Sequence, residues 1–131
     1  MNKELIMKLI DRAREASDNA YCPYTNVPIG CALLTEDNII FCGCNIESKV
    51  LSSSSSAGEV AVLKAISEGH TAFSAACFYA AGFMPFPDGL TRQFLAEFNP
   101  MLSIVIANAD TYSLSTLNDL FPFAPELPET E

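Results

Sequence analysis

The chain is poor in basic residues. It has seven lysine and arginine residues against sixteen aspartate and glutamate residues, which gives a net charge of −9 at pH 7. A surface of this sign repels phosphate backbones, so we expect no nucleic-acid partner. Much of the acidity lies near the C-terminus, where proline and glutamate predict a disordered acidic tail over residues 126–131.

Long hydrophobic runs and a disulfide pattern are also missing. Hydrophobic residues make up 50% of the chain, but no run approaches the roughly 20 apolar residues that a transmembrane helix needs. The five cysteines are odd in number and no secretory signal precedes them, which favours reduced thiols in the cytoplasm. We therefore expect a cytoplasmic protein with no membrane partner, in which residues 1–125 form one domain.

The hydrophobic pattern predicts alternating helices and strands. Apolar residues three and four apart predict a helix over residues 3–17, and two β-rich runs predict a hairpin. The further elements are a helix from the serine tract to Gly69, buried strands within 74–83 and 102–109, a helix over about 89–98, and a short last helix capped by Ser113 or Ser115. This order predicts an α/β fold of three layers, with helices on both faces of a mixed sheet.

The predicted hairpin pairs residues 30–35 with residues 39–45 and places Cys31 opposite Cys42. Cys44 lies two residues further along the same strand, so three thiols would share one face of the sheet. Such a group could hold a metal ion. Buried apolar cysteines are the commoner arrangement, and we favour that interpretation.

Two helix starts carry strong capping signals. Ser56, the last of five consecutive serines, is followed three residues later by Glu59, which predicts a capping box. Asp88 is a good N-cap, with Thr91 at the third helical position. In mixed sheets, sites form where strands give way to helix N-termini. The helix starts at Ser56 and Asp88 are therefore candidate site positions.

Four blocks of sequence, in order and at near-constant spacing, resemble the small cytidine deaminases over about residues 5–124. They are AYCPYTNVPIGCALLTEDNIIFCGCNIES, VLKAISEGH, PDGLTRQFLAEFNP and TLNDLFPFA. The resemblance implies a cytidine-deaminase-like fold and a homotetramer whose sites are completed by neighbouring subunits. It also implies a zinc ion held by three cysteines, in the motifs Cys-Ala-Glu-Arg and Pro-Cys-Gly-x-Cys-Arg-Gln, with the glutamate as proton shuttle.

This chain departs from those motifs. Aligned without gaps, Ser56, Asp88 and Thr91 stand at the three cysteine positions, and Gly58 stands at the glutamate position. Hydroxyls are poor zinc donors, so the sequence predicts a degenerate member of the family with no metal site and no cofactor, zinc being absent.

A shift of one residue would place Ala57 at the ligand position and keep Glu59 as a proton shuttle. The candidate catalytic residues are thus Glu59, Asp88 and Thr91, although each has an ordinary structural interpretation as a capping or helix-start residue.

Part of a nucleoside site is retained. The resemblance assigns Asn45 and Glu47 to a ribose hydroxyl, and alternation along the strand sends both side chains to one face. The main chain at Ser56 and Ala57 could meet the base carbonyl, and Val27 stands where the family has a stacking phenylalanine. These five residues are the predicted substrate-binding set.

The sequence therefore predicts a protein that is not a deaminase, a pseudoenzyme acting as a nucleoside-binding, small-molecule-binding or regulatory module. Its expected partners are a small molecule and further copies of itself, as a dimer or tetramer, or an active homologue. One alternative is a zinc-independent enzyme whose repurposed pocket acts on another substrate. The other is a true cytidine deaminase that converts cytidine to uridine.

Overall fold

The computed structural model describes residues 1–125, and the tail predicted over residues 126–131 lies outside the described residues. A five-stranded sheet with the order β2-β1-β3-β4-β5 runs through the middle of the molecule. Among the strands within residues 1–125, β3 and β4 pair in parallel and the other neighbours pair antiparallel, so the sheet is mixed, as predicted. The strands are β1 (Gly30–Thr35), β2 (Ile40–Cys44), β3 (Phe73–Tyr79), β4 (Ser103–Ala107) and β5 (Tyr112–Thr116).

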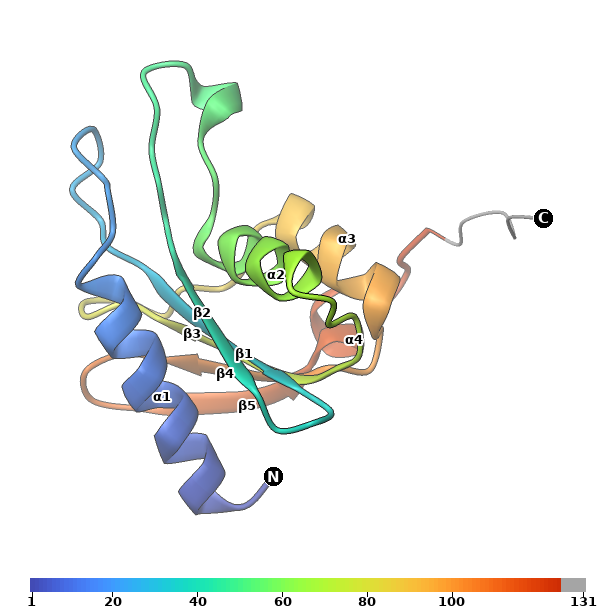
Figure 1. The fold of residues 1–131 in the computed structure, drawn as a ribbon. Helices are drawn as coiled ribbons and strands as arrows, with labels where there is room; N and C mark the ends of the chain where they lie inside the picture. The colour runs from blue at the N-terminus through green and yellow to red at the C-terminus, as the bar shows by residue number, and fades with distance from the viewer. Residues whose placement is uncertain (126–131) are drawn as a thin grey trace.

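Helices cover both faces of the sheet, so the predicted three-layer α/β/α fold is confirmed (Figure 1). Helix α1 (Lys3–Ser17) packs Leu9 and Ile10 on one face. Helices α2 (Ala57–Ser67), α3 (Gly89–Phe98) and α4 (Leu117–Leu120) cover the other face. No helix within residues 1–125 has the length and apolar character needed to cross a bilayer.

The helix starts form where the capping signals predict them. Ser56 Oγ accepts the Glu59 amide at 3.1 Å, which is one of the two hydrogen bonds of the predicted capping box. Asp88 Oδ1 accepts the Thr91 amide at 2.8 Å and caps α3 in the same way. Each cap partners an amide that a helix leaves free in its first turn. These two caps fix where α2 and α3 begin.

The serine tract is ordered by its own hydrogen bonds. Ser54 Oγ accepts the Ser48 amide, and the main chain of Ser55 exchanges two hydrogen bonds with Ile46. Between them lies the short 3₁₀-helix η1 (Leu51–Ser53). The segment between β2 and α2 projects well beyond the sheet (Figure 1). It is therefore a hydrogen-bonded arm that leads into α2.

The predicted register of the hairpin is wrong by one residue. Cys31 pairs with Gly43, and Ala32 pairs with Cys42. The loop is the three-residue one that the predicted strand ends leave, with the Thr35 amide bonded to Ile39 O across it. Counted outward from Thr35 and Ile39, Cys31 lies opposite Gly43, so the predicted pairing with Cys42 did not follow from the predicted loop. Because side chains alternate along a strand, Cys31 faces away from Cys42 and Cys44, and the three thiols do not share a face.

The last helix begins later than predicted. Ser113 and Ser115 lie inside β5, which pairs antiparallel with β4 at the edge of the sheet. Thr116 caps α4 instead, in a capping box with Asp119. A half-exposed edge strand of mixed polarity has a weak hydrophobic pattern, which explains why the sequence did not reveal it.

Candidate functional site

A cavity of about 150 Å³ lies where α2 and α3 begin. It brings together five of the predicted site residues: Asn45, Ser56, Ala57, Asp88 and Thr91. The two helix starts contribute four of them, and Asn45 follows the last residue of β2. The other lining residues are Ile29, Gly58, Phe78, Pro85, Phe86 and Pro87.

A hydroxyl pair joins the two helices beside this cavity. Ser56 Oγ and Thr91 Oγ1 lie 2.8 Å apart, and either hydroxyl can be the donor. Thr91 is buried, with 3% of its surface exposed. Ser56 Oγ also caps α2, and the Thr91 amide is held by Asp88. The predicted residues at the two helix starts therefore form one connected hydrogen-bond network.

Gly58 has no space for a side chain. A Cβ built at this position would lie 2.6 Å from Thr91 Cγ2 and 2.8 Å from Phe78 Cε1. Both distances are shorter than carbon atoms tolerate. A larger residue at position 58 therefore requires Phe78 or Thr91 to move.

The polar groups of the cavity favour a ligand that carries an acceptor oxygen. Amides in the first turn of a helix have no intrahelical partner, and the helix dipole gives them a partial positive charge. Ala57 and Gly58 are the first two residues of α2, and both line the cavity. Among the lining residues within 1–125, Asp88 is the one with an ionisable side chain. The cavity therefore combines main-chain donors with a carboxylate.

Asn45 fixes one wall of the cavity. Its Oδ1 accepts the Ile29 amide at 2.8 Å, and its Nδ2 donates to Val27 O at 2.8 Å. An amide group has two N–H donors, so one remains for a ligand. Asn45 thus holds the loop before β1 and also lines the cavity.

Three predicted site residues lie outside the lining of this cavity: Val27, Glu47 and Glu59. Val27 lines a separate cavity beside the end of α1. The Glu47 carboxylate accepts hydrogen bonds from Thr25 Oγ1 and from the amides of Tyr24 and Thr25. The side-chain bond from Thr25 is the main cause that lowers the pKa of Glu47. Glu47 is therefore occupied in holding the loop over residues 24–25.

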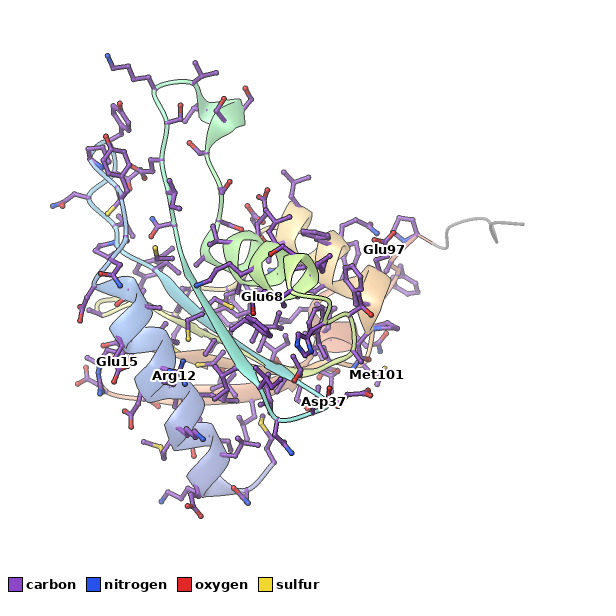
Figure 2. The ribbon with its side chains drawn as sticks, viewed as in Figure 1. Arg12, Glu15, Asp37, Glu68, Glu97 and Met101 are labelled. Carbon is purple, nitrogen blue, oxygen red and sulfur yellow. The ribbon has the colours of Figure 1, made fainter. Side chains whose placement is uncertain are left out.

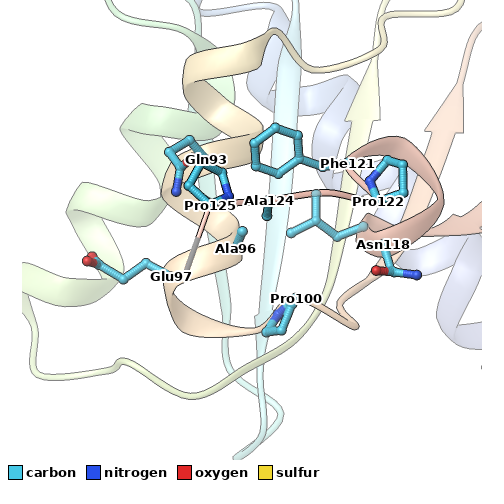
Figure 3. Close-up of a pocket in the computed structure, with 10 residues that line it drawn as sticks. Gln93, Ala96, Glu97, Pro100, Asn118, Phe121, Pro122, Ala124 and Pro125 are labelled. Atoms are coloured by element: carbon cyan, nitrogen blue, oxygen red, sulfur yellow. The ribbon is translucent and has the colours of Figure 1, made fainter. Parts of the chain in front are cut away.

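The apolar lining of the cavity was not predicted from the sequence. Phe78 is buried in β3, and Phe86 is half exposed just before α3. Phe86 lies in the segment Pro-Phe-Pro immediately before the Asp88 cap, and no pattern in the sequence marks it as part of a site. A second cavity, of about 550 Å³, lies between α3 and the segment that follows α4 (Figure 3). None of the predicted site residues lines it.

The family model that matches this chain is described as the cytidine and deoxycytidylate deaminase zinc-binding region, and it matches residues 3–105. A cytidine deaminase from Sporosarcina psychrophila is 39% identical over 79% of this chain and 77% of the relative. A probable cytidine deaminase from Dictyostelium discoideum is 34% identical over 93% of this chain and 84% of the relative.

Solved structures give the same result. The crystal structure of a cytidine deaminase from Burkholderia pseudomallei is similar with a TM-score of 0.87 and 30% identity, covering 95% of this chain and 99% of that chain. The cytidine deaminase from Mycobacterium tuberculosis has a TM-score of 0.80 and 28% identity, with 92% and 97% covered. The fold is therefore that of these deaminases, as the resemblance implied.

These comparisons contradict two predictions from the sequence. Relatives at 39% and 34% identity carry the name cytidine deaminase or probable cytidine deaminase, so the interpretation as a pseudoenzyme, a binding or regulatory module that is not a deaminase, is wrong. The prediction that zinc is absent is contradicted as well, because the matching model describes a zinc-binding region and spans both helix starts.

The helix starts of this chain carry other donor atoms than the family's three cysteines. Zinc in proteins is bound by thiolates, imidazoles and carboxylates. Ser56 and Thr91 offer hydroxyls that bond to each other, and the Asp88 carboxylate caps α3. Within residues 1–125, no three His, Cys, Asp or Glu side chains lie together as a metal site would require. As arranged in the structure, these side chains do not fit a zinc ion bound by three protein ligands.

Proposed function

Because this chain belongs to the cytidine deaminase family, we propose that it converts cytidine to uridine in the cavity where α2 and α3 begin. In this reaction water adds to C4 of the base, the C4–N bond breaks and ammonia leaves. The observation that carries the proposal is the position of this cavity, which lies inside the matched residues 3–105 and at two helix starts.

The lining residues suit a pyrimidine nucleoside. The first amides of α2, at Ala57 and Gly58, donate to the carbonyl oxygen of the base. The rings of Phe78 and Phe86 supply apolar surface for the base, and an aromatic contact with a base is worth about 1–3 kcal/mol. The free N–H of Asn45 donates to a ribose hydroxyl. Glu47 keeps the neighbouring loop in place through Thr25.

Asp88 is the residue we assign to proton transfer. One of its carboxylate oxygens caps α3, which leaves the other for the substrate. As the bond from water to C4 forms, this oxygen takes a proton from the water, and it returns the proton to the departing amino group. In this proposal Ser56, Asp88 and Thr91 take the places of the family's three cysteines, and Gly58 that of its glutamate.

The test is a deaminase assay on the purified full chain. Formation of uridine and ammonia from cytidine is followed in three samples: protein as purified, protein with added zinc, and protein treated with a chelator. Cytidine binding is measured separately by calorimetry, and the metal content by mass spectrometry. We expect uridine above the protein-free background in at least one sample. Background rates in all three, with or without cytidine binding, would overturn deamination as the function.

A matched pair of variants tests the role of Asp88. Asn is as good an N-cap as Asp, so Asp88→Asn keeps the start of α3 but removes the proton-exchanging oxygen. We expect kcat to fall by about 100-fold with an unchanged melting temperature. Asp37→Asn, at the exposed hairpin turn, is the control and keeps full activity (Figure 2). Equal kcat values for both variants would remove Asp88 from the mechanism.

Residues 1–125 are the proposed functional domain, and we propose that it works as a homo-oligomer. Large apolar side chains support association, with Leu51, Leu90 and Phe123 each more than 80% exposed. The five free cysteines support a reducing, cytoplasmic location. Light scattering coupled to size exclusion tests the assembly, and a monomer at micromolar concentration would contradict it.

A further inference from the structure

The Arg92 guanidinium joins two segments that lie far apart in the sequence. Arg92 is a partly buried residue of α3. Its Nε donates to Pro87 O at 2.6 Å, and its Nη1 donates to Leu120 O at 2.7 Å. Pro87 lines the proposed nucleoside cavity, and Leu120 is the last residue of α4. One side chain thus ties a wall of the cavity to the C-terminal helix.

That wall has few other hydrogen bonds to the rest of the protein. Pro85, Phe86 and Pro87 all line the cavity. Two of the three are prolines, which have no N–H to donate. The Phe86 amide bonds locally, to Met84 O. Among the described residues, the bond from Arg92 to Pro87 O is therefore the one that links the Met84–Pro87 main chain to α3.

The charge of Arg92 is directed at carbonyl oxygens and not at a carboxylate. Among the described residues, the arginine that forms an ion pair is Arg14, which contacts Asp11 on α1. Hydrogen bonds from a charged donor are shorter and stronger than neutral ones. A planar guanidinium can also hold two acceptors in a fixed geometry, which a lysine ammonium cannot. The arrangement therefore depends on arginine specifically.

We propose that Arg92 is a positioning residue for the nucleoside cavity, although it is not among the residues that line it. By holding Pro87 to α4, it keeps the Pro85–Pro87 wall against the base. Phe121, which follows Leu120, lines the second cavity, between α3 and the segment that follows α4 (Figure 3). Leu120 also lies beyond the matched residues 3–105, so the wall depends on a part of the chain outside the matched region. The inference rests on the proposed nucleoside site.

The experiment compares Arg92→Met, which removes both hydrogen bonds but keeps an apolar stem, with Arg92→Lys, which keeps the charge. Arg12→Met, on α1 (Figure 2), is the control for loss of an arginine. Amide exchange is measured by mass spectrometry on peptides that cover residues 82–90, without substrate. Loss of a charged hydrogen bond predicts exchange about tenfold faster there in Arg92→Met, a smaller change in Arg92→Lys and none in Arg12→Met.

Activity supplies the second measurement. We expect the KM for cytidine of Arg92→Met to rise about tenfold with a smaller change in kcat, because the wall contacts the base but not the reacting atoms. Wild-type exchange over residues 82–90 overturns the inference, as does faster exchange over the whole chain, which would indicate a general loss of stability. An unchanged KM in an active enzyme also overturns it and leaves the proposed function intact.

The deamination assay and the exchange measurement can fail separately. A wild-type chain that does not deaminate cytidine overturns that function, while the exchange data still decide whether Arg92 holds the wall. If Arg92→Met does not fold, Arg92→Gln, which keeps N–H donors without the charge, is compared in its place by the same two criteria.

Discussion

The hydroxyls of Ser56 and Thr91 lie 2.8 Å apart and connect the first turns of α2 and α3. Each residue also takes part in its own helix start, since Ser56 Oγ accepts the Glu59 amide and the Thr91 amide is capped by Asp88. The two helix N-termini are therefore held together by polar groups that are satisfied within the protein. This network sets the shape of the cavity, and its parts can be tested separately.

Removal of the Ser56 hydroxyl is expected to destabilise the fold. Ser56→Ala removes the N-cap of α2, which costs about 1 kcal/mol, and leaves the buried Thr91 hydroxyl without its partner, which adds about 1 kcal/mol. Urea denaturation should give a free energy of unfolding lower by roughly 2 kcal/mol. Ser52→Ala, at an exposed position of η1, is the control. Equal stability of the two variants would mean that the hydroxyl network contributes nothing.

Addition of a methyl group at Gly58 should also destabilise the protein. Alanine is favoured over glycine in a helix by about 1 kcal/mol. Here the new Cβ would lie 2.6 Å from Thr91 Cγ2 and 2.8 Å from a ring carbon of Phe78, and overpacking of a core costs about 1–3 kcal/mol. The contacts outweigh the propensity, so Gly58→Ala is expected to lower stability. Gly89→Ala has nothing within 4 Å of its new Cβ and should be neutral or stabilising.

A double substitution identifies the contact responsible. Thr91→Ser removes the Cγ2 atom but keeps the hydroxyl that pairs with Ser56. Gly58→Ala should therefore cost less in the Thr91→Ser background than in the wild type, by about 0.5–1 kcal/mol in a double-mutant cycle of urea midpoints. Strict additivity of the two changes would place the strain at Phe78 instead.

Acid should release the loop over residues 24–25 from Glu47. Hydrogen bonds to the ionised carboxylate, first of all from the Thr25 hydroxyl, lower the pKa of Glu47 below its ordinary value of 4.5. A lowered pKa in the folded state means that the bonded form is fully present above pH 4.5 and is lost as the pH falls through the lowered pKa. The Tyr24 and Thr25 amides should therefore lose their protection from hydrogen exchange, measured by NMR, as the pH falls through the lowered pKa of Glu47.

Two variants separate this carboxylate from general acid unfolding. Glu47→Gln should remove the acid transition of the two amides and leave them weakly protected at every pH. Thr25→Val removes the main cause of the shift, so the Glu47 transition should move up toward pH 4.5. A transition that stays in place in both variants would show that another group controls the loop.

The sequence predicted the helices and strands that carry strong local signals. Helix α1 repeats apolar residues over four turns, and the caps at Ser56 and Asp88 place α2 and α3 within one residue. The three-residue loop of the hairpin was predicted, but the pairing counted from it was not, since that loop places Cys31 opposite Gly43 and not opposite Cys42. Strand β5 forms through its pairing with β4, and the hydrophobic pattern of its own residues did not predict it.

The site was predictable in part for a similar reason. Residues at helix starts could be located because a cap fixes them, and Ser56, Asp88 and Thr91 do meet at one cavity. Glu47 lies outside the lining, and its carboxylate accepts three hydrogen bonds from Tyr24 and Thr25, in a loop over twenty residues earlier. Contacts of this range follow from tertiary packing, which a pattern along one strand does not reveal.

The buried thiols should resist alkylation in the native protein. Burial raises the pKa of Cys77 to about 12 and raises that of Cys31 well above its ordinary value. Only a thiolate reacts, and at pH 8 a thiol with a pKa near 12 is ionised in about one molecule in ten thousand. Brief treatment with iodoacetamide followed by mass spectrometry should therefore leave Cys31 and Cys77 unmodified, while the partly exposed Cys22 reacts. Both buried thiols should react at the rate of Cys22 in 8 M urea, which serves as the control. Rapid labelling of Cys77 without denaturant would mean that the sheet opens locally at β3, and it would contradict the packing of the central strands.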